Sequence, residues 1–313
     1  MGSLKPPNDI RRSDIIFSRI LKISGWLLPL LILSIGLFLF ENAQPTIKKF
    51  GFVFILGTVW DPIHDIFGAG PVIYGTLASS LIAIIIGTPI SVAVALLLSE
   101  IIPGRLSRSL SFLVEMLAAI PSVVYGLWGI FVLAPWMRST IEPFLAERFG
   151  AIPIFSGPFY GVGLLSAGVI LAIMIVPTIS SICREIFRNI PNQQREAALA
   201  LGATKWEAIR LAVLKNSKAG IFGSVTLGLG RALGETLAVT MVIGNRAEIS
   251  KSIFAPSQTM ASLIANEYAE ATSQLHLSAL IQVGLTLFLV TFVVNGLARV
   301  MVWQTTLRKD AQC

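Results

Sequence analysis

The chain has 313 residues, of which 54% are hydrophobic and only 13% are charged, and its mean hydropathy is +0.78. Soluble domains carry about 25% charged residues, so this composition excludes an ordinary soluble protein. A net charge of +7 is compatible with nucleic-acid binding, but the positions of the basic residues along the chain give a different explanation.

The apolar residues fall in long blocks, each with the roughly 20 residues that a membrane-spanning helix needs. We expect six transmembrane helices, at about 23–40, 72–99, 111–136, 162–183, 219–243 and 276–302. They predict an all-α polytopic membrane protein, with a retained tail at 1–22, a transmembrane domain over 23–302 and a second tail at 303–313. With both tails in the cytoplasm, 17 Lys and Arg residues lie on the inner side and six on the outer side. The positive-inside rule favours this orientation, and nucleic acid is not expected as a partner.

The first outer loop and the third span each contain an irregular feature. Residues 51–60 are apolar but too short to span, so we expect them to lie at the membrane interface or to pack on the bundle. In the third span, Glu115 is expected to reach the inner surface or to pair with Arg108. Pro121 is expected to bend this span and to leave a carbonyl for Ser122 or a neighbouring helix.

The inner loop 184–218 predicts two short helices at a glycine corner. Asn192 is expected to cap the first helix, and Gly202 to end it in a left-handed conformation. The second helix begins with a capping box formed by Thr204 and Glu207.

The second of these helices carries an apolar stripe. Trp206, Ile209 and Val213 follow one another at spacings of three and four, which places them on one helix face. Such a stripe could fill a groove of a partner protein. The same pattern would also suit two helices that lie on the lipid of the inner leaflet.

Two charged residues occur inside the fifth span, which is otherwise apolar. Arg231 and Glu235 are four residues apart and would share a face of a continuous helix. Charge at bilayer depth costs several kcal/mol and is rare without a function. The span is also rich in glycine, including Gly230 and Gly234, which can let helices approach closely.

The motifs in these segments resemble a known family. Glu196-Ala197-Ala198-Leu-Ala-Leu-Gly202-Ala-Thr204 is similar to the inner loop of permease subunits of binding-protein-dependent ABC importers. Gly230-Arg231-Ala-Leu-Gly-Glu235-Thr236 resembles the phosphate-specific permeases, and the PstC-type subunit more than its PstA-type partner. Ile120-Pro121-Ser-Val-Val-Tyr125-Gly126, Gly75-Thr76-Leu77 and Trp60-Asp61-Pro62 fit the same pattern. One departure is Lys215 after Leu214, where the family usually has proline.

The resemblance implies a type I importer permease of the MetI-like fold in the bacterial inner membrane. The implied partners are a PstA-type permease, a dimer of ATP-binding subunits, an external phosphate-binding protein and membrane lipid. The loop of this chain that would dock on the ATPase, called the docking loop, would include Glu196, Ala197, Ala198, Gly202, Thr204, Trp206 and Glu207. No phosphate-binding loop for a nucleotide occurs in the chain, so ATP and magnesium are expected in the ATPase and this chain is not expected to be an enzyme. No catalytic residue, cofactor or metal site is predicted in it.

The role of the charged pair stays open between two interpretations. Arg231 and Glu235 could form an ion pair, within the helix or as a latch to a partner helix, or Arg231 could attract an oxyanion through its guanidinium. In the second case Glu235 would accept a hydrogen bond from protonated phosphate, or hold Arg231 until phosphate arrives.

Sulfate or molybdate are alternative substrates. A secondary transporter with Glu235 or Glu115 as a proton relay, or a membrane scaffold without transport, are alternative functions.

Overall fold

The computed structural model describes the backbone of residues 8–310 and the side chains of residues 14–300. Residues 1–7 and 311–313 of the two predicted tails lie outside the described part of the chain. The α-helices, in chain order, are α1 (Asn8–Phe50), α2 (Val53–Leu56), α3 (Gly70–Leu96), α4 (Gly104–Ala119), α5 (Ser122–Trp128), α6 (Ala134–Trp136), α7 (Glu142–Phe149), α8 (Leu164–Arg188), α9 (Asn192–Ala200), α10 (Lys205–Ala208), α11 (Lys218–Gly234), α12 (Leu237–Val242), α13 (Met260–Glu267) and α14 (Gln274–Asp310).

Short segments of other types join these helices. A two-stranded antiparallel hairpin is formed by β1 (Trp60–Asp61) and β2 (Ile66–Phe67), with Trp60 opposite Phe67. The remaining segments are the π-helices η1 (Leu97–Ile101), η2 (Gly129–Leu133), η3 (Met137–Ile141) and η5 (Ile209–Leu214), and the 3-10 turn η4 (Pro153–Phe155).

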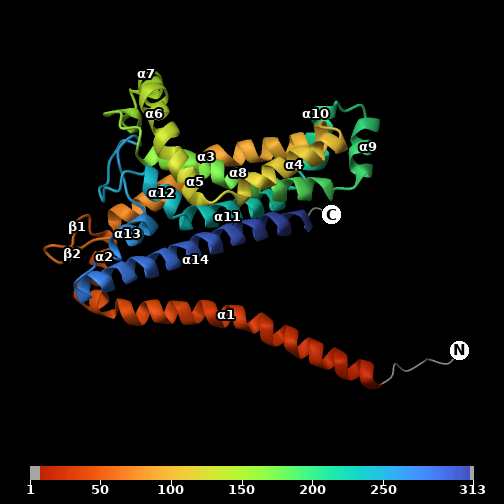
Figure 1. The fold of residues 1–313 in the computed structure, drawn as a ribbon. Helices are drawn as coiled ribbons and strands as arrows, with labels where there is room; N and C mark the ends of the chain where they lie inside the picture. The colour runs from red at the N-terminus through yellow and green to blue at the C-terminus, as the bar shows by residue number, and fades with distance from the viewer. Residues whose placement is uncertain (1–7, 311–313) are drawn as a thin grey trace.

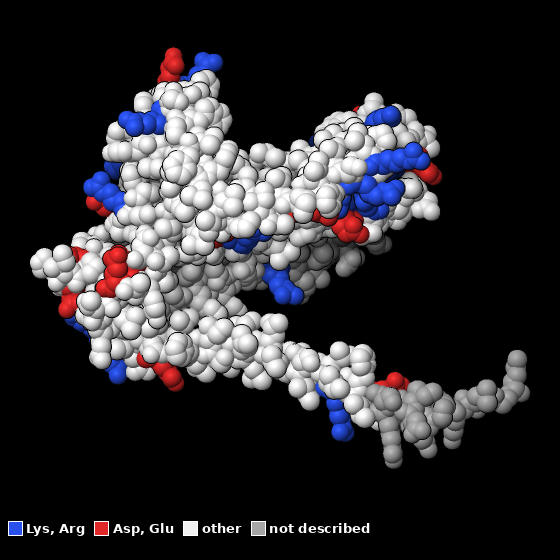
Figure 2. All heavy atoms as spheres, in the orientation of Figure 1, with Lys and Arg blue, Asp and Glu red and all other residues white. Residues whose placement is uncertain are grey.

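Helices α3, α8, α11 and α14 run lengthwise between an end that carries α9 and α10 and an opposite end that carries the hairpin, and α1 diverges from them toward its start (Figure 1). Charged side chains gather toward the two ends, and the visible surface between them is mostly uncharged (Figure 2). Four helical stretches are long and apolar enough to cross a membrane: Asp14–Phe50, Gly70–Ile101, Leu164–Arg188 and Gln274–Val300. The bent pair α4 and α5–α7 gives a fifth candidate. The predicted all-α membrane fold is confirmed, but within the described residues four or five stretches qualify as spans, not the predicted six.

The third predicted span is sharply bent. The helix axis turns by 88° between α4 and the helix that begins at Ser122. Ile120, which precedes Pro121, has the extended ψ of 128° that a following proline favours. The carbonyl of Leu117 at the break accepts a hydrogen bond from the hydroxyl of Tyr125 at 2.8 Å. This carbonyl is satisfied by Tyr125, not by Ser122.

The fifth predicted span is divided into α11 and α12. Helix α11 ends at Gly234, and Glu235 is extended, with φ −70° and ψ 127°. Glycine is a weak helix former, and α11 is rich in it near this end. Arg231 and Glu235 therefore do not share one helix, and the prediction that they lie on a common helical face is wrong.

Helix α8 lies at the centre of the main core. Its buried face includes Ile170, Ile175 and Ile179, and α3 and α11 pack against it. A Cβ atom on Gly228 of α11 would lie 2.6 Å from Ile179 Cδ1, so glycine permits this close approach.

The glycine pair predicted for close packing has a different environment. A Cβ atom on Gly234 would meet nothing within 4 Å, and one on Gly230 would lie 3.7 Å from the amide of Asn295. Close contact within this chain thus occurs at Gly228, two residues before Gly230, rather than at the predicted pair.

The short apolar run 51–60 packs on the end of the bundle that lies opposite α9 and α10. Phe54 of α2 and Phe67 of β2 are buried there against α3, α13 and α14. The indole Nε1 of Trp60 donates to Glu267 Oε2 at 2.8 Å, and His276 Nε2 lies 2.9 Å from the same oxygen. The hairpin is thereby fixed to α13 and α14.

Candidate functional site

Arg231 lies in the last turn of α11 and is half-buried. It is about 20 Å along the helix from Lys218, at roughly 1.5 Å per residue. Its Nη1 donates a hydrogen bond to Thr178 Oγ1 on α8, at 3.4 Å. The guanidinium also acts electrostatically on the phenol of Tyr125 on α5. The bundle therefore holds this cation among polar groups of neighbouring helices.

Glu235 occupies the break between α11 and α12 and is also half-buried. Within the described part of the chain its carboxylate has no hydrogen bond or ion pair, and none joins it to Arg231. The interpretation as an intrahelical ion pair is wrong, because the helix ends before Glu235. The carboxylate is left available for a group that this chain does not provide.

The corner of the inner loop forms as its sequence predicts. Gly202 has a φ of +85°, the left-handed conformation that glycine adopts readily. Thr204 Oγ1 accepts from the Glu207 N–H, and the Glu207 carboxylate accepts from the Thr204 N–H at 2.8 Å. The N–H and the hydroxyl of Thr204 both donate to this carboxylate, and these two hydrogen bonds lower the pKa of Glu207. The predicted glycine corner and capping box are confirmed.

Two details of the loop differ from the predictions. Asn192 does not cap α9 with its side chain; its Oδ1 accepts from Arg195 Nη1 at 3.2 Å. The apolar stripe is not exposed throughout, since Trp206 is 60% exposed but Val213 is fully buried. The π-helix η5 changes the turn here, so spacings of three and four do not keep these residues on one exposed face.

The exposed apolar surface of the loop instead centres on the corner itself. Leu201 is 89% exposed, and Trp206 and Leu211 are also exposed. A hollow of about 710 Å³ beside them is lined by Ala197, Ala198, Leu201, Gly202, Ala203 and Glu207, among others. Sequence reasoning placed Leu201 at the end of the first loop helix, whereas α9 ends at Ala200, and its exposure was not predicted. Glu196 is exposed on α9.

Lys215, which replaces the usual proline, closes η5. Its N–H donates to the carbonyl of Arg210 at 3.1 Å. Proline has no N–H, so it could not make this bond. Lysine at this position therefore stabilises the π-helical end of the loop before α11 begins at Lys218.

Glu115 pairs across helices. Its Oε1 lies 2.7 Å from Arg184 Nη2 on α8, so the predicted partner Arg108 is wrong. Among the described residues, no group of three His, Cys, Asp or Glu side chains could hold a metal ion. His64 and His276 each contact a carboxylate, of Asp61 and Glu267 respectively.

The family model for the binding-protein-dependent transport system inner membrane component matches residues 87–302. The chain belongs to this family. It is therefore a permease subunit of an ABC transporter and a multi-pass protein of the inner membrane. The match includes both the inner loop and the segment with Arg231 and Glu235.

Curated relatives match almost the whole chain. The phosphate transport system permease protein PstC of Mesorhizobium japonicum is 42% identical over 303 residues, covering 96% of this chain and 93% of the relative. The protein of the same name from Haemophilus influenzae is 44% identical over 291 residues, covering 92% of each chain. A probable PstC of Methanocaldococcus jannaschii is 37% identical over 85% of this chain and 86% of the relative.

Solved structures share the fold at lower identity. A chain of a bacterial alginate ABC transporter is 16% identical, with a TM-score of 0.61 and coverage of 96% of this chain and 97% of that one. A chain of the MetNI methionine ABC transporter is 19% identical, with a TM-score of 0.56, and the match covers 79% of this chain and 99% of that one. These similarities support the importer permease fold.

Proposed function

We propose that this chain is a permease subunit that moves inorganic phosphate across the bacterial inner membrane in an ATP-driven importer. The observation that carries the proposal is the half-buried Arg231 guanidinium beside the break between α11 and α12, where among residues 14–300 it has a hydroxyl but no carboxylate as a partner. A guanidinium presents paired N–H donors that match the oxygens of phosphate. The names of the relatives support phosphate over sulfate or molybdate.

The proposed complex contains a second permease of the PstA type, a dimer of ATP-binding subunits and an external phosphate-binding protein. ATP and magnesium would be bound by the ATPase. The exposed corner around Leu201 and Trp206 offers an apolar surface for docking on that ATPase. The start of α1 and the end of α14 lie at the same end of the molecule as α9 (Figure 1), which supports cytoplasmic termini together with the positive-inside rule.

In this mechanism, closure of the ATPase dimer displaces the docking loop and opens the spans to the outer side. Arg231 then attracts phosphate from the binding protein, and Thr178 helps to orient the guanidinium. Glu235 would repel a fully ionised anion but can accept a hydrogen bond from a protonated phosphate oxygen. Because sulfate at neutral pH has no such proton, Glu235 would favour phosphate.

The test is phosphate uptake into vesicles that hold the four components, with wild-type chain, Arg231→Lys or Arg231→Gln. Hydrogen bonds to charged groups contribute about 1.5–3 kcal/mol, so Arg231→Gln should lower uptake by at least roughly tenfold. Arg105→Gln serves as a control, because Arg105 is exposed and has no polar partner in the described part of the chain. Uptake by Arg231→Gln at the wild-type rate, in an intact complex, would rule out the pathway role.

The same vesicles separate the rival functions. Uptake that needs ATP and persists with a protonophore supports the importer. Uptake abolished by the protonophore, but preserved without ATP when the gradient is clamped, would indicate a secondary transporter. Assembly without flux would indicate a scaffold, and preferential uptake of sulfate or molybdate would correct the substrate.

A further inference from the structure

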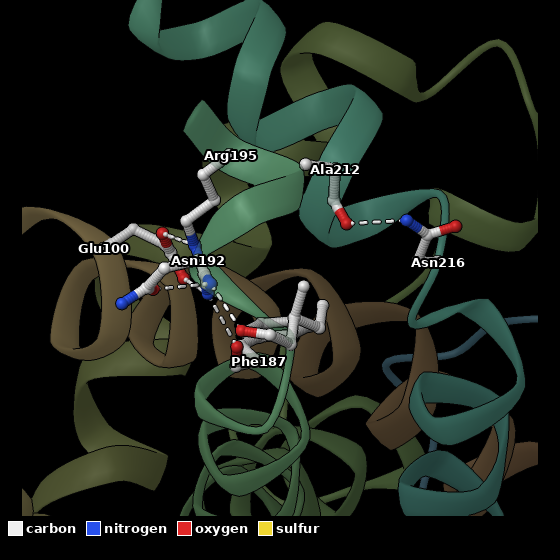
Figure 3. A network of polar contacts seen from close by, with 7 residues as sticks. Glu100, Phe187, Asn192, Arg195, Ala212 and Asn216 are labelled. Atoms are coloured by element: carbon white, nitrogen blue, oxygen red, sulfur yellow. Dashed lines mark hydrogen bonds and ion pairs between the residues drawn. The ribbon is translucent and has the colours of Figure 1, made fainter. Parts of the chain in front are cut away.

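Arg195 directly precedes Glu196, the first residue of the docking loop. All N–H donors of its guanidinium are hydrogen-bonded at the inner end of the bundle. Its Nε and Nη2 bind the two oxygens of Glu100, at 3.0 and 2.7 Å. Nη2 also donates to the carbonyl of Phe187 at 2.8 Å. Nη1 donates to the carbonyl of Ile190 at 2.6 Å and to Asn192 Oδ1 at 3.2 Å. Figure 3 shows the guanidinium at the centre of this network.

The hydrogen bonds of Arg195 connect its own helix to two other elements. Glu100 lies on η1, at the inner end of the α3 span, while Phe187 lies in the last turn of α8. Arg195 itself belongs to α9, the first helix of the docking loop. The last carbonyls of a helix lack partners within the helix and attract positive charge, so the guanidinium completes the end of α8. One side chain thus joins the docking helix to two spans.

The ion pair at the centre of this junction is largely shielded from water. The side chain of Arg195 is 19% exposed and that of Glu100 is 8% exposed. A buried bidentate ion pair whose other N–H groups are also hydrogen-bonded fixes the relative position of its two residues. Loss of either residue leaves an uncompensated buried charge.

Neighbouring contacts reinforce the same junction. Arg188 Nη2 on α8 donates to Ser107 Oγ on α4 at 2.9 Å, and this hydroxyl donates to the carbonyl of Leu98 on η1 at 2.6 Å. On the other side of the loop, Asn216 Nδ2 donates to Gln194 Oε1 on α9 at 2.9 Å. The inner ends of α3, α4, α8 and α9 are therefore held together by side chains as well as by chain connections.

We propose that Arg195 is the positioning residue that makes α9 move as one body with the inner ends of α3 and α8. Displacement of the docking loop is then transmitted to the spans. A loop joined to the spans only by its backbone would bend and absorb part of the displacement. Thr178, the partner of Arg231, lies on α8, so the moving body includes one wall of the proposed pathway. The inference rests on the proposed function, because it concerns transmission from an ATPase to that pathway.

The first experiment compares phosphate imported per ATP hydrolysed by the reconstituted complex. The variants are Arg195→Gln and the double variant Glu100→Gln with Arg195→Gln, and Arg105→Gln is the control. Arg195→Gln leaves Glu100 buried without its partner, so we expect less assembled complex. The double variant removes both charges, so we expect assembly near the wild-type level. We expect the amount of phosphate imported per ATP hydrolysed to fall roughly fivefold. A double variant with the wild-type ratio would overturn the proposal, because Arg195 would then act only by compensating Glu100.

The second experiment does not depend on the substrate. Spin labels at Gln193→Cys on α9 and Leu97→Cys on η1, both exposed positions, report the distance between the docking helix and the inner end of α3. In the complete complex, ATP should leave this distance unchanged in the wild-type background and should broaden or shift it in the double variant. An ATP-driven shift in the wild-type background would contradict the rigid junction. If wild-type vesicles hydrolyse ATP but import no phosphate, the proposed substrate fails while this distance still tests the junction.

Discussion

The guanidinium of Arg231 bonds to the hydroxyl of Thr178 on α8, although a carboxylate follows only four residues later in its own chain. The end of α11 at Gly234 separates the two charges, since Glu235 continues as extended backbone. The cation is therefore oriented by a neutral group, and it keeps most of its donors for an incoming anion.

Thr178→Val should lower phosphate uptake at limiting phosphate by about threefold. The substitution keeps the shape of the side chain but removes the oxygen that orients Arg231. Because the bond is long at 3.4 Å, we expect it to contribute less than the roughly 1.5–3 kcal/mol of a well-formed hydrogen bond to a charged group. Uptake kinetics in reconstituted vesicles measure the change. Thr226→Val is the matched control, because the Thr226 hydroxyl donates only to the carbonyl of Phe222 on its own helix. Equal effects of the two variants would show that the hydroxyl does not act through Arg231.

Glu235→Gln should admit sulfate that the wild-type chain excludes. The carboxylate repels both anions, but it can accept a hydrogen bond from the hydroxyl of hydrogen phosphate, which sulfate lacks. Glutamine carries no charge and can also donate. Competition of sulfate against labelled phosphate uptake measures the selectivity. If Glu235→Gln transports phosphate normally and gains no sulfate transport, the selectivity role of Glu235 is wrong while the role of Arg231 is unaffected.

Gly75→Ala should destabilise the junction between α3 and the segment before α13. An added Cβ atom would lie 2.1 Å from the carbonyl oxygen of Gln258, a backbone atom that cannot move aside alone. Overpacking of this kind costs about 1–3 kcal/mol. Thermal unfolding of the purified permease in detergent should show a lower midpoint. Gly223→Ala on α11 has nothing within 4 Å of the added atom, so it should leave the midpoint unchanged or raise it.

Thr204→Ala should weaken α10, because it removes the hydroxyl half of the capping box. A cap of this type contributes about 1 kcal/mol. Hydrogen exchange at residues 205–208 in the isolated permease measures the loss. Lys205→Ala, in the same turn, is the control, since it leaves both capping hydrogen bonds in place.

The capping box should also depend on pH in a defined direction. The hydrogen bonds from Thr204 lower the pKa of Glu207 below its ordinary value of 4.5. The stabilisation is therefore fully present above pH 4.5 and is lost as the pH falls through the lowered pKa. Exchange protection of α10 should be constant between about pH 5 and 8 and should decrease only below about pH 4. A decrease near neutral pH would show that another group controls this helix.

The sequence by itself determined the features that depend on local patterns. Long apolar blocks have few alternatives to spanning helices, because backbone groups in lipid must be bonded within the segment. Gly202 and the pair Thr204 and Glu207 act over a few residues, so the corner and the capping box could be predicted from their spacing. Pro121 similarly indicated a bend, although the size of the turn did not follow from it.

Only the tertiary structure decided which distant side chains meet. Arg195 and Glu100 are far apart in the chain, and nothing local distinguishes Glu100 from other acidic residues near a helix end. The same is true of Thr178 beside Arg231, and of Arg184 in place of Arg108 beside Glu115. The break at Glu235 also needed the structure, because helix periodicity continues in the sequence where the helix itself ends. Packing of α8 against α3, α4 and α11 sets these contacts, and that packing depends on how the whole bundle closes.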